Sequence, residues 1–351
     1  MIRLRASAAL ALAAATAAAP SWRFANDSAF EGQQSFGLSF VSKSTGIVAG
    51  QLAIGAAVYA TSDGAATWAP LEWTPLDFTD TAATVSSLVV CADLFVQFSL
   101  DLGKTWNASV GDGEGINGCT TVRRAAFDAK AVAIVGNLGL DGVNAVAMST
   151  DGGISFTRHD ASAALTCGNA LYGAFPNAST WFVTAGSTQP NAGQIAVTRN
   201  GGKSFELVHT ASANFVILGI DCASGDECCA LASSGSVAEV ICTYDSGARW
   251  STSFRKDAAG GQVNLNDIRY DPFSRLFWAV GGVYQTGPAW VLRSTPDFKN
   301  FTIDTELAGA YGTAIDVAAD GSGAMFGIVF ETDPNDDSND NYIITNLPKK
   351  M

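Results

Sequence analysis

Four aspartates are the residues best placed to perform chemistry on a substrate. Asp221, Asp267, Asp271 and Asp316 lie in or directly after short apolar segments in the second half of the chain. Hydrolysis of a glycosidic bond requires two carboxyl groups on either side of the bond, one protonated and one ionised. A pair such as Asp221 and Asp267 would therefore indicate a glycoside hydrolase, whereas solvated loop positions would explain the same residues without any chemistry.

Three arginines form the second candidate set. Arg123 and Arg124 are adjacent, and Arg269 directly precedes Tyr270. A guanidinium group binds a carboxylate in a planar, two-point geometry, so we treat the three arginines as candidate binding residues for a carboxylate on a substrate or partner. Sialidase chemistry would also require a tyrosine nucleophile with an acidic partner, for which Tyr270 and Glu239 are the available candidates.

Histidine-assisted nucleophilic catalysis is not supported. His159 and His209 are the only histidines, and no Gly-x-Ser-x-Gly sequence is present to hold a serine nucleophile. We expect both imidazoles to lie on the surface.

An acidic segment near the C-terminus is the one candidate for a metal site. Asp333 and Asp337 alternate with Asn335 and Asn339, as at the beginning of a calcium-binding loop, but the glycine and the terminal glutamate of such a loop are missing. Calcium at Asp333 and Asp337 is therefore one interpretation, a solvated hairpin loop is the other, and no further cofactor is expected.

A repeat indicates which elements must position these residues. Segments of the form Ser/Thr-x-Asp-x-Gly-x-Thr/Ser-aromatic recur along the chain. In such a turn the carboxylate accepts backbone N–H groups, the glycine adopts a positive φ without steric cost, and the aromatic residue packs between neighbouring units. We predict a structural role for the third residue of each copy, which is Asp63, Asp101, Asp151, Asn200 or Asp245.

The spacing of the repeat predicts the fold. The closing aromatic residues lie at positions 68, 106, 156, 205, 250 and 301, and three short apolar strands precede each copy. Each unit therefore has the size of one four-stranded propeller blade, with the turn between its third and fourth strands. After Phe301 only three strands remain, so we expect Trp22–Ala25 to supply the missing strand and close the ring. The prediction is an all-β fold, a single β-propeller of about seven four-stranded blades.

The repeat resembles the Asp-box, or bacterial neuraminidase repeat. Three families share it at comparable strength: single-propeller photosystem II assembly factors, sortilin-type receptors and xyloglucan-cleaving glycosidases. The length and one-domain layout are most similar to the assembly factors, which implies a lumenal protein with a basic patch on its binding face. The receptors imply a larger ring with a cysteine-rich module and a membrane span, and the glycosidases imply two propellers. Sialidases imply an early arginine motif, but the corresponding segment here is Phe36–Phe40.

The cysteines indicate an oxidising compartment. The chain has seven, so at least one must remain free if the others pair. Secreted proteins with the Asp-box repeat often carry a Cys-x5-Cys rung, so the resemblance implies a bridge between Cys222 and Cys228. Cys228 could instead face Cys242 across the next hairpin, and Cys229 is a further candidate for a disulfide bridge.

Charge and the N-terminal segment restrict the partners and the location. The formal net charge of −13 argues against nucleic acid as a partner. Residues 1–19 combine Arg3 and Arg5 with an Ala- and Leu-rich run that ends in small residues, which predicts a cleaved signal peptide too short to anchor the protein in a membrane. We therefore expect residues 20–351 to form one propeller domain, secreted or in an organelle lumen.

These observations predict a function in outline. We expect an exported, non-catalytic propeller that binds a protein or a glycan and resembles the photosystem II assembly factors. The alternative is a glycoside hydrolase, either sialidase-like or active on β-glucans.

Overall fold

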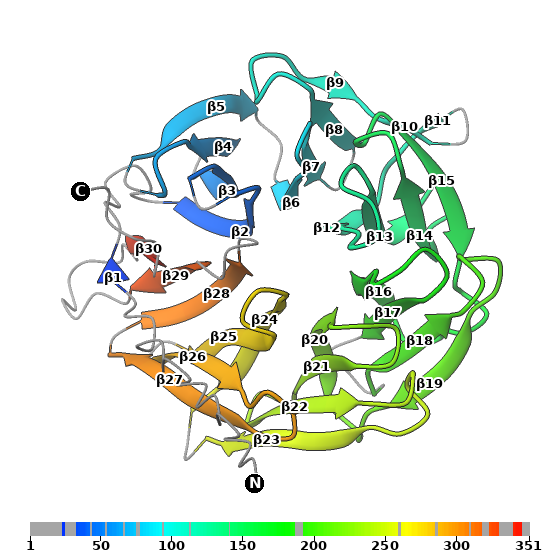
Figure 1. Cartoon of the computed structure of the whole chain (residues 1–351), viewed down its shortest axis with the longest axis vertical. Helices are drawn as coiled ribbons and strands as arrows, with labels where there is room; N and C mark the ends of the chain where they lie inside the picture. Colours follow the sequence, from blue (N-terminus) through cyan, green and yellow to red (C-terminus); the bar gives the residue numbers. More distant parts are fainter. Residues whose placement is uncertain are drawn as a thin grey trace, which may run out of the picture.

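The protein is an all-β propeller in which radial sheets surround a centre, as the computed structural model shows (Figure 1). The structure describes residues 23–24, 33–42, 44–52, 55–65, 67–74, 78–92, 95–111, 114–139, 141–186, 192–258, 261–284, 287–308, 310–317, 323–329 and 340–345. The predicted signal peptide lies outside these residues.

Five sheets are formed by four consecutive strands each. We name each blade after its innermost strand. The β2 blade contains β2 (Gln33–Phe40), β3 (Gly46–Leu52), β4 (Gly55–Thr61) and β5 (Ala69–Thr74), and the β6 blade contains β6 (Phe78–Ala83), β7 (Leu88–Ala92), β8 (Phe95–Ser99) and β9 (Asn107–Ala108). The β16 blade contains β16 (Asn169–Ala174), β17 (Trp181–Gly186), β18 (Gln194–Thr198) and β19 (Glu206–Thr210). The β20 blade contains β20 (Val216–Cys222), β21 (Cys228–Ser233), β22 (Val237–Thr243) and β23 (Ser251–Asp257), and the β24 blade contains β24 (Val263–Asp271), β25 (Leu276–Val283), β26 (Ala289–Ser294) and β27 (Phe301–Leu307).

The first and last strands of the chain share a sheet. The β28 blade contains β28 (Ala310–Val317), β29 (Gly323–Val329), β30 (Asp340–Thr345) and β1 (Arg23–Phe24). Strand β1 pairs antiparallel with β30, with Arg23 opposite Thr345 and Phe24 opposite Ile344. The N-terminal strand is therefore the outermost strand of this blade.

The prediction of about seven four-stranded blades is wrong. Among the described residues six sheets have four strands, whereas the β12 blade has six: β12 (Cys119–Arg124), β13 (Val132–Leu138), β14 (Val143–Ser149) and β15 (Ser155–Asp160), extended by β10 (Val110–Gly111) and β11 (Glu114–Gly115). Strand β9 has only two residues, and the chain then crosses to the next blade, where the Val110 N–H donates to the Ile154 carbonyl (3.1 Å). The parallel pairing of β10 with β15 satisfies backbone groups that an outermost strand would otherwise leave open.

The repeated turns share one hydrogen-bond pattern. In the copy that links β8 to β9, the Asp101 carboxylate accepts the backbone N–H (2.8 Å) and the hydroxyl (2.7 Å) of Thr105. The Ser99 hydroxyl donates to Asp101 and accepts the Gly103 N–H (2.8 Å for both bonds). Asp63, Asp151, Asn200 and Asp245 each accept the backbone N–H four residues later in the same way.

These turns should contribute to stability in a pH-dependent manner. The hydroxyl and N–H of Thr105 lower the pKa of Asp101 from 3.8 to about 2. Because the folded-state pKa is depressed, the ionised carboxylate stabilises the fold above pH 3.8, and this contribution is lost as the pH falls through about 2.

We expect Asp101→Ala to destabilise the protein at neutral pH and Asp101→Asn to destabilise it much less. The reason is that Asn200 already maintains the same turn, with its amide oxygen accepting the Ser204 N–H (3.0 Å) and its amide nitrogen donating to the Ser204 hydroxyl (2.8 Å). Urea unfolding at pH 7 and pH 3 measures both effects, and the asparagine variant should lose less stability than the parent between these two pH values. Equal destabilisation by both substitutions would contradict the proposed hydrogen-bonding role.

A β-bulge occurs at the same place in every described innermost strand. The pairing of β2, β6, β12, β16, β20, β24 and β28 with the following strand shifts register in the first half of each strand. Asp80 and Asp267 directly follow the shift, and Arg123, Asp221 and Arg269 lie two residues beyond their own shifts. Bulges change the direction of side chains, so their common position collects these charged residues in two layers around the centre.

Candidate functional site in the central cavity

A cavity of about 560 Å³ opens where the innermost strands end. Its lining includes residues from all seven described innermost strands or the loops that follow them, among them Ser39, Ala83, Arg124, Asp221 and Asp316. The wall therefore depends on the whole ring and not on one blade.

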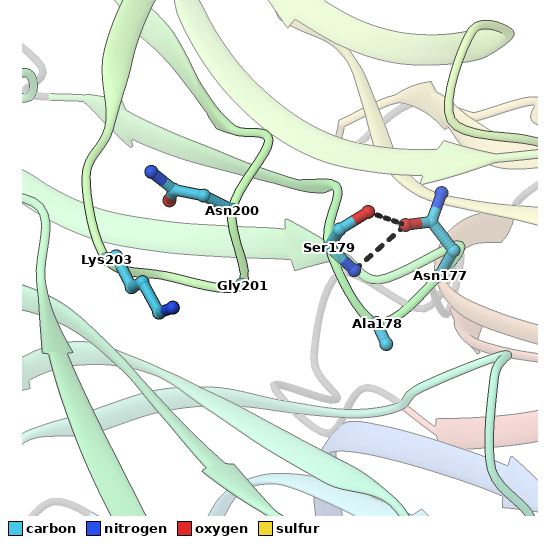
Figure 2. A pocket seen from close by; sticks show the side chains of 6 residues that line it. All are labelled: Asn177, Ala178, Ser179, Asn200, Gly201 and Lys203. Carbon is cyan, nitrogen blue, oxygen red and sulfur yellow. Dashed lines mark hydrogen bonds between the residues drawn. The ribbon is translucent and has the colours of Figure 1, made fainter.

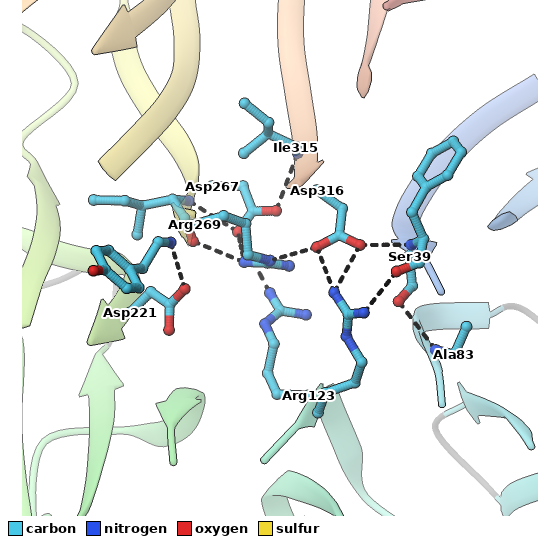
Figure 3. A network of polar contacts seen from close by, with 12 residues as sticks. Ser39, Ala83, Arg123, Asp221, Asp267, Arg269, Ile315 and Asp316 are labelled. Carbon is cyan, nitrogen blue, oxygen red and sulfur yellow. Dashed lines mark hydrogen bonds and ion pairs between the residues drawn. The ribbon is translucent and has the colours of Figure 1, made fainter. Parts of the chain in front are cut away.

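An ion-pair network crosses the centre of the ring (Figure 3). Arg123 pairs with Asp80 of the β6 blade and reaches Asp267 of the β24 blade (3.5 Å). Arg269 contacts Asp267 (2.5 Å) and Asp316 (3.5 Å). The β16 and β20 blades lie between β12 and β24 along the chain, so the Arg123–Asp267 contact joins two blades that are not consecutive in the ring.

Each of the four network aspartates also connects its own blade to the next. Asp80 accepts the Val122 N–H (3.1 Å), Asp221 the Tyr270 N–H (2.7 Å), Asp267 the Ile315 N–H (3.2 Å) and Asp316 the Phe40 N–H (2.5 Å). Charge-assisted bonds of this kind are stronger than neutral ones, so these carboxylates hold adjacent innermost strands together. Close packing accompanies them: a Cβ atom at Gly37 would lie only 2.6 Å from Asp80 Oδ1.

Burial and the neighbouring arginines have opposite effects on the pKa values of the acids. Burial raises the pKa of Asp80, although the Arg123 and Arg269 charges oppose this, and burial also raises the pKa of Asp221. Burial raises the pKa of Tyr172 to about 12, so its phenol stays neutral. Despite burial, the carboxylates around Arg269 raise the pKa of its guanidinium, which therefore remains charged.

The structure brings the three predicted arginines together, but they are not equally accessible. The side chains of Arg123 and Arg269 are each 13% exposed, whereas that of Arg124 is 35% exposed. Arg124 donates to the Phe40 carbonyl (2.6 Å) and to Asp316 (3.1 Å), and it also lines the cavity. All three line the cavity, and Arg124, as the most exposed, is the best placed to meet a ligand.

Asp221 and Asp267, the predicted pair of catalytic acids, are bonded to other groups of the protein. Asp221 uses one oxygen for the Cys222 N–H (2.8 Å) and the other for Tyr270, and Asp267 is held by Arg269 and Ile315. Asp271 is fully buried and accepts the N–H groups of the turn after β24, so it lies apart from the network. This arrangement favours a structural role for the acids.

The sialidase residues are not assembled. Glu239 lies on β22, the third strand of its blade, and pairs with Arg255 (2.5 Å). Tyr270 contributes to the cavity wall and packs its ring on Phe277 and Phe298.

Both histidines lie on outer strands. His159, on β15, packs against Trp181, and His209, on β19, packs against Trp250. Burial lowers the pKa of His209, which favours its neutral form.

Sequence reasoning missed Asp80. This residue is 3% exposed, pairs with Arg123 and accepts the Val122 N–H. The available signal was an aspartate within a predicted first strand, the same feature that identified Asp221, Asp267 and Asp316.

The calcium candidates Asp333 and Asp337 lie outside the described residues. Within the part of the chain that the structure describes, no group of three or more metal-ligating side chains comes together. Within the same part, no helix is long and apolar enough to cross a membrane.

Three disulfides are present. Cys222 bonds to Cys228 and Cys229 to Cys242, joining neighbouring strands of the β20 blade. Cys91–Cys119 was not predicted and connects the β6 and β12 blades. Cys167 is free and buried. Disulfides of this number are typical of an oxidising compartment.

A second, shallow hollow lies at one end of the β16 blade (Figure 2). It is formed by two turns, Asn177–Ser179 and Asn200–Lys203. The Asn177 amide oxygen accepts the Ser179 N–H (3.0 Å) and hydroxyl (2.9 Å), so this oxygen is used within the turn. The central cavity is therefore the better candidate site.

The chain is a single β-propeller with a charged central cavity, and known structures share its fold. The chain is similar to "YCF48 bound to D1 peptide", with a TM-score of 0.62 and 13% identity over 94% of this chain and 96% of that chain. It is also similar to YCF48 from Cyanidioschyzon merolae, with a TM-score of 0.63 and 15% identity over 92% of this chain and 98% of that chain. A third similar structure is the GH74 xyloglucanase from Xanthomonas campestris, with a TM-score of 0.60 and 13% identity over 89% of this chain and 54% of that chain. No family model and no curated protein matches the sequence. At these identities the likeness establishes the fold.

Proposed function

We propose that this chain is an exported, non-catalytic propeller whose central cavity binds a segment of a partner protein, in the manner of an assembly or stability factor. The observation that carries the proposal is that the acids and Arg124 have different roles in the cavity. The acids join adjacent blades, whereas the Arg124 side chain lines the cavity and is 35% exposed.

Two further observations support this function. The three disulfides favour an exported protein. The likeness to a YCF48 structure determined with a D1 peptide favours a protein segment over a glycan as the ligand, while the likeness to a xyloglucanase keeps glycoside hydrolysis as the alternative.

Peptide binding by an Arg124→Gln variant tests the proposal. Random nonapeptides with free C-termini are displayed and selected against the purified chain, and the enriched peptides are then synthesised with a fluorescent label. We expect Arg124→Gln to weaken their binding about tenfold or more, because hydrogen bonds to a charged group are lost. Arg158→Gln, on the outer strand β15, is the matched control and should bind as the parent does.

Activity assays on xyloglucan and sialosides test the alternative function, glycoside hydrolysis. The parent and an Asp221→Asn/Asp267→Asn variant should both be inactive. Turnover by the parent that disappears in the double variant would overturn the binding function and establish a glycoside hydrolase.

A further inference from the structure

Most of the exposed large hydrophobic side chains lie at one end of the ring. Nine such residues occur among those described, with exposed fractions from 37% to 70%. Seven of them lie at the end where the central cavity opens, and we call these the apolar tips: Val85, Leu100, Leu102, Val110, Ile154, Tyr244 and Phe273. Single exposed hydrophobic residues are normal, but a group on one face indicates an interaction site.

Strand direction places the apolar tips at this end. Neighbouring strands of a blade run antiparallel, so the loop after the first strand and the turn after the third strand lie at the same end. The first-strand loops carry Val85 and Phe273, and the third-strand turns carry Leu100, Leu102, Ile154 and Tyr244. Val110 joins them because its N–H donates to the Ile154 carbonyl (3.1 Å).

The apolar tips lie on both sides of the cavity mouth. The β6 and β12 blades carry five of them, and the β20 and β24 blades, across the ring, carry Tyr244 and Phe273 (Figure 1). A protein interface has a continuous apolar centre bounded by a polar rim. A lipid surface is planar and offers the same contact everywhere, so it can meet separate tips on opposite sides of a ring.

The charges at this end are nearly balanced, unlike those of the whole chain. The loops after the first and third strands, as far as they are described, contain seven Lys or Arg and eight Asp or Glu, whereas the chain contains 20 and 33. The turns that carry the two leucines, Tyr244 and Phe273 each carry a basic residue as well, which is Lys104, Arg249 or Arg275. Lipids without net charge therefore meet no repulsion here, whereas a net charge of −13 opposes contact with an anionic membrane.

The fold does not require a leucine at position 102. Its φ is +59°, a region that a bulky side chain rarely adopts, and the corresponding residues of three other turns are Gly64, Gly152 and Gly201. The side chain is 59% exposed, so it adds little to the core. A strained, exposed leucine where other turns have glycine indicates a role outside the fold.

We propose that the cavity end of the ring rests on a bilayer of lipids without net charge, with the apolar tips inserted at the boundary between headgroups and acyl chains. Tyrosine, phenylalanine and leucine are typical of protein surfaces that insert there, and binding strengthens with the apolar area that is buried. The proposal does not rest on the proposed function, because Leu100, Leu102 and Phe273 do not line the cavity.

Flotation of the protein with phosphatidylcholine vesicles in a density gradient tests the proposal. The parent is compared with Leu100→Ser/Leu102→Gly on the β6 blade, with Phe273→Ser across the ring, and with the combination of all three substitutions. Vesicles of phosphatidylcholine with added phosphatidylglycerol provide an anionic surface for comparison.

The variants can be separated from effects on folding. Leu100→Ser/Leu102→Gly introduces the residues of the first repeated turn, Ser62 and Gly64, and glycine relieves the positive φ, so this variant should melt no lower than the parent. Leu207→Ser, on the outer strand β19, is the matched control for loss of an exposed leucine.

We expect the parent to float with phosphatidylcholine vesicles and Leu207→Ser to float equally well. Leu100→Ser/Leu102→Gly and Phe273→Ser should each partition about tenfold more weakly, because apolar area is lost from the interface. The two losses should multiply in the combined variant, because the substituted sites lie on different blades and do not share partners. Leu100→Ser/Leu102→Gly should still bind the selected nonapeptides as the parent does, so vesicle binding and peptide binding fail separately.

Several results would overturn the proposal. One is a parent that stays in solution with phosphatidylcholine vesicles, or that floats only when phosphatidylglycerol is added. Another is a loss of flotation in Leu100→Ser/Leu102→Gly but not in Phe273→Ser, which would show a local patch and not a planar contact. Self-association that disappears in the double variant, without vesicle binding by the parent, would identify an interface between copies of the chain.

Discussion

Asp267→Ala is expected to destabilise the protein by about 3–5 kcal/mol, because removal of one member of a buried ion pair leaves the remaining charge without compensation. Asp267 is 6% exposed and contacts Arg269 (2.5 Å) and Arg123 (3.5 Å). It also accepts the N–H groups of Ile268 (3.0 Å) and Ile315 (3.2 Å). The substitution therefore takes one of two carboxylate partners from each guanidinium group and breaks the connection to the β28 blade at once.

Equilibrium unfolding in urea at pH 7 measures this loss. The control is Glu206→Ala, which removes an ion pair with Arg199 in which both side chains are largely exposed, and such pairs contribute about 0–1 kcal/mol. If the two variants unfold at the same urea concentration, the network does not hold the ring together.

Removal of the Cys91–Cys119 disulfide is expected to cost roughly 3–4 kcal/mol. The bond closes a loop with a sequence separation of 28, and the loss of chain entropy on crosslinking the unfolded state gives a value of this size. The bond also joins β7 to β12 across two blades, where both cysteines are almost fully buried. Alanine is the appropriate replacement because it adds no polar group to this apolar cluster.

The matched control is the Cys222→Ala/Cys228→Ala variant. That bond has a sequence separation of 6 and connects paired residues of one hairpin, so the same entropy argument predicts a loss of roughly 2 kcal/mol. Both variants are unfolded without reductant. A larger loss from the Cys222–Cys228 pair would show that the bond between blades is not the more important of the two.

The predicted binding residues illustrate how far sequence reasoning reached. Arg123, Arg124 and Arg269 do converge, because all three lie on innermost strands, and any propeller directs these toward its centre. Their separate roles could not be predicted, because the accessibility of Arg124 depends on Asp316, which is 192 residues away in the sequence.

The features that the sequence determined by itself are local. Each repeated turn is held by hydrogen bonds between residues two and four positions apart, such as Ser99 to Asp101 and Asp101 to Thr105. Alternating apolar strands between such turns specify a β-propeller, because each sheet can bury its faces only against neighbouring sheets.

The tertiary structure alone decided how the ring was completed and what its centre contains. The extension of the β12 blade by β10 and β11 depends on which edge the chain meets after a two-residue strand. The partners of Asp80, Asp267 and Arg123 depend on bulges in different blades that come together only when the ring closes. Contacts between residues so far apart in the chain leave no spacing pattern in the sequence, so the ion-pair network across the ring and the partial exposure of Arg124 are properties of the assembled ring.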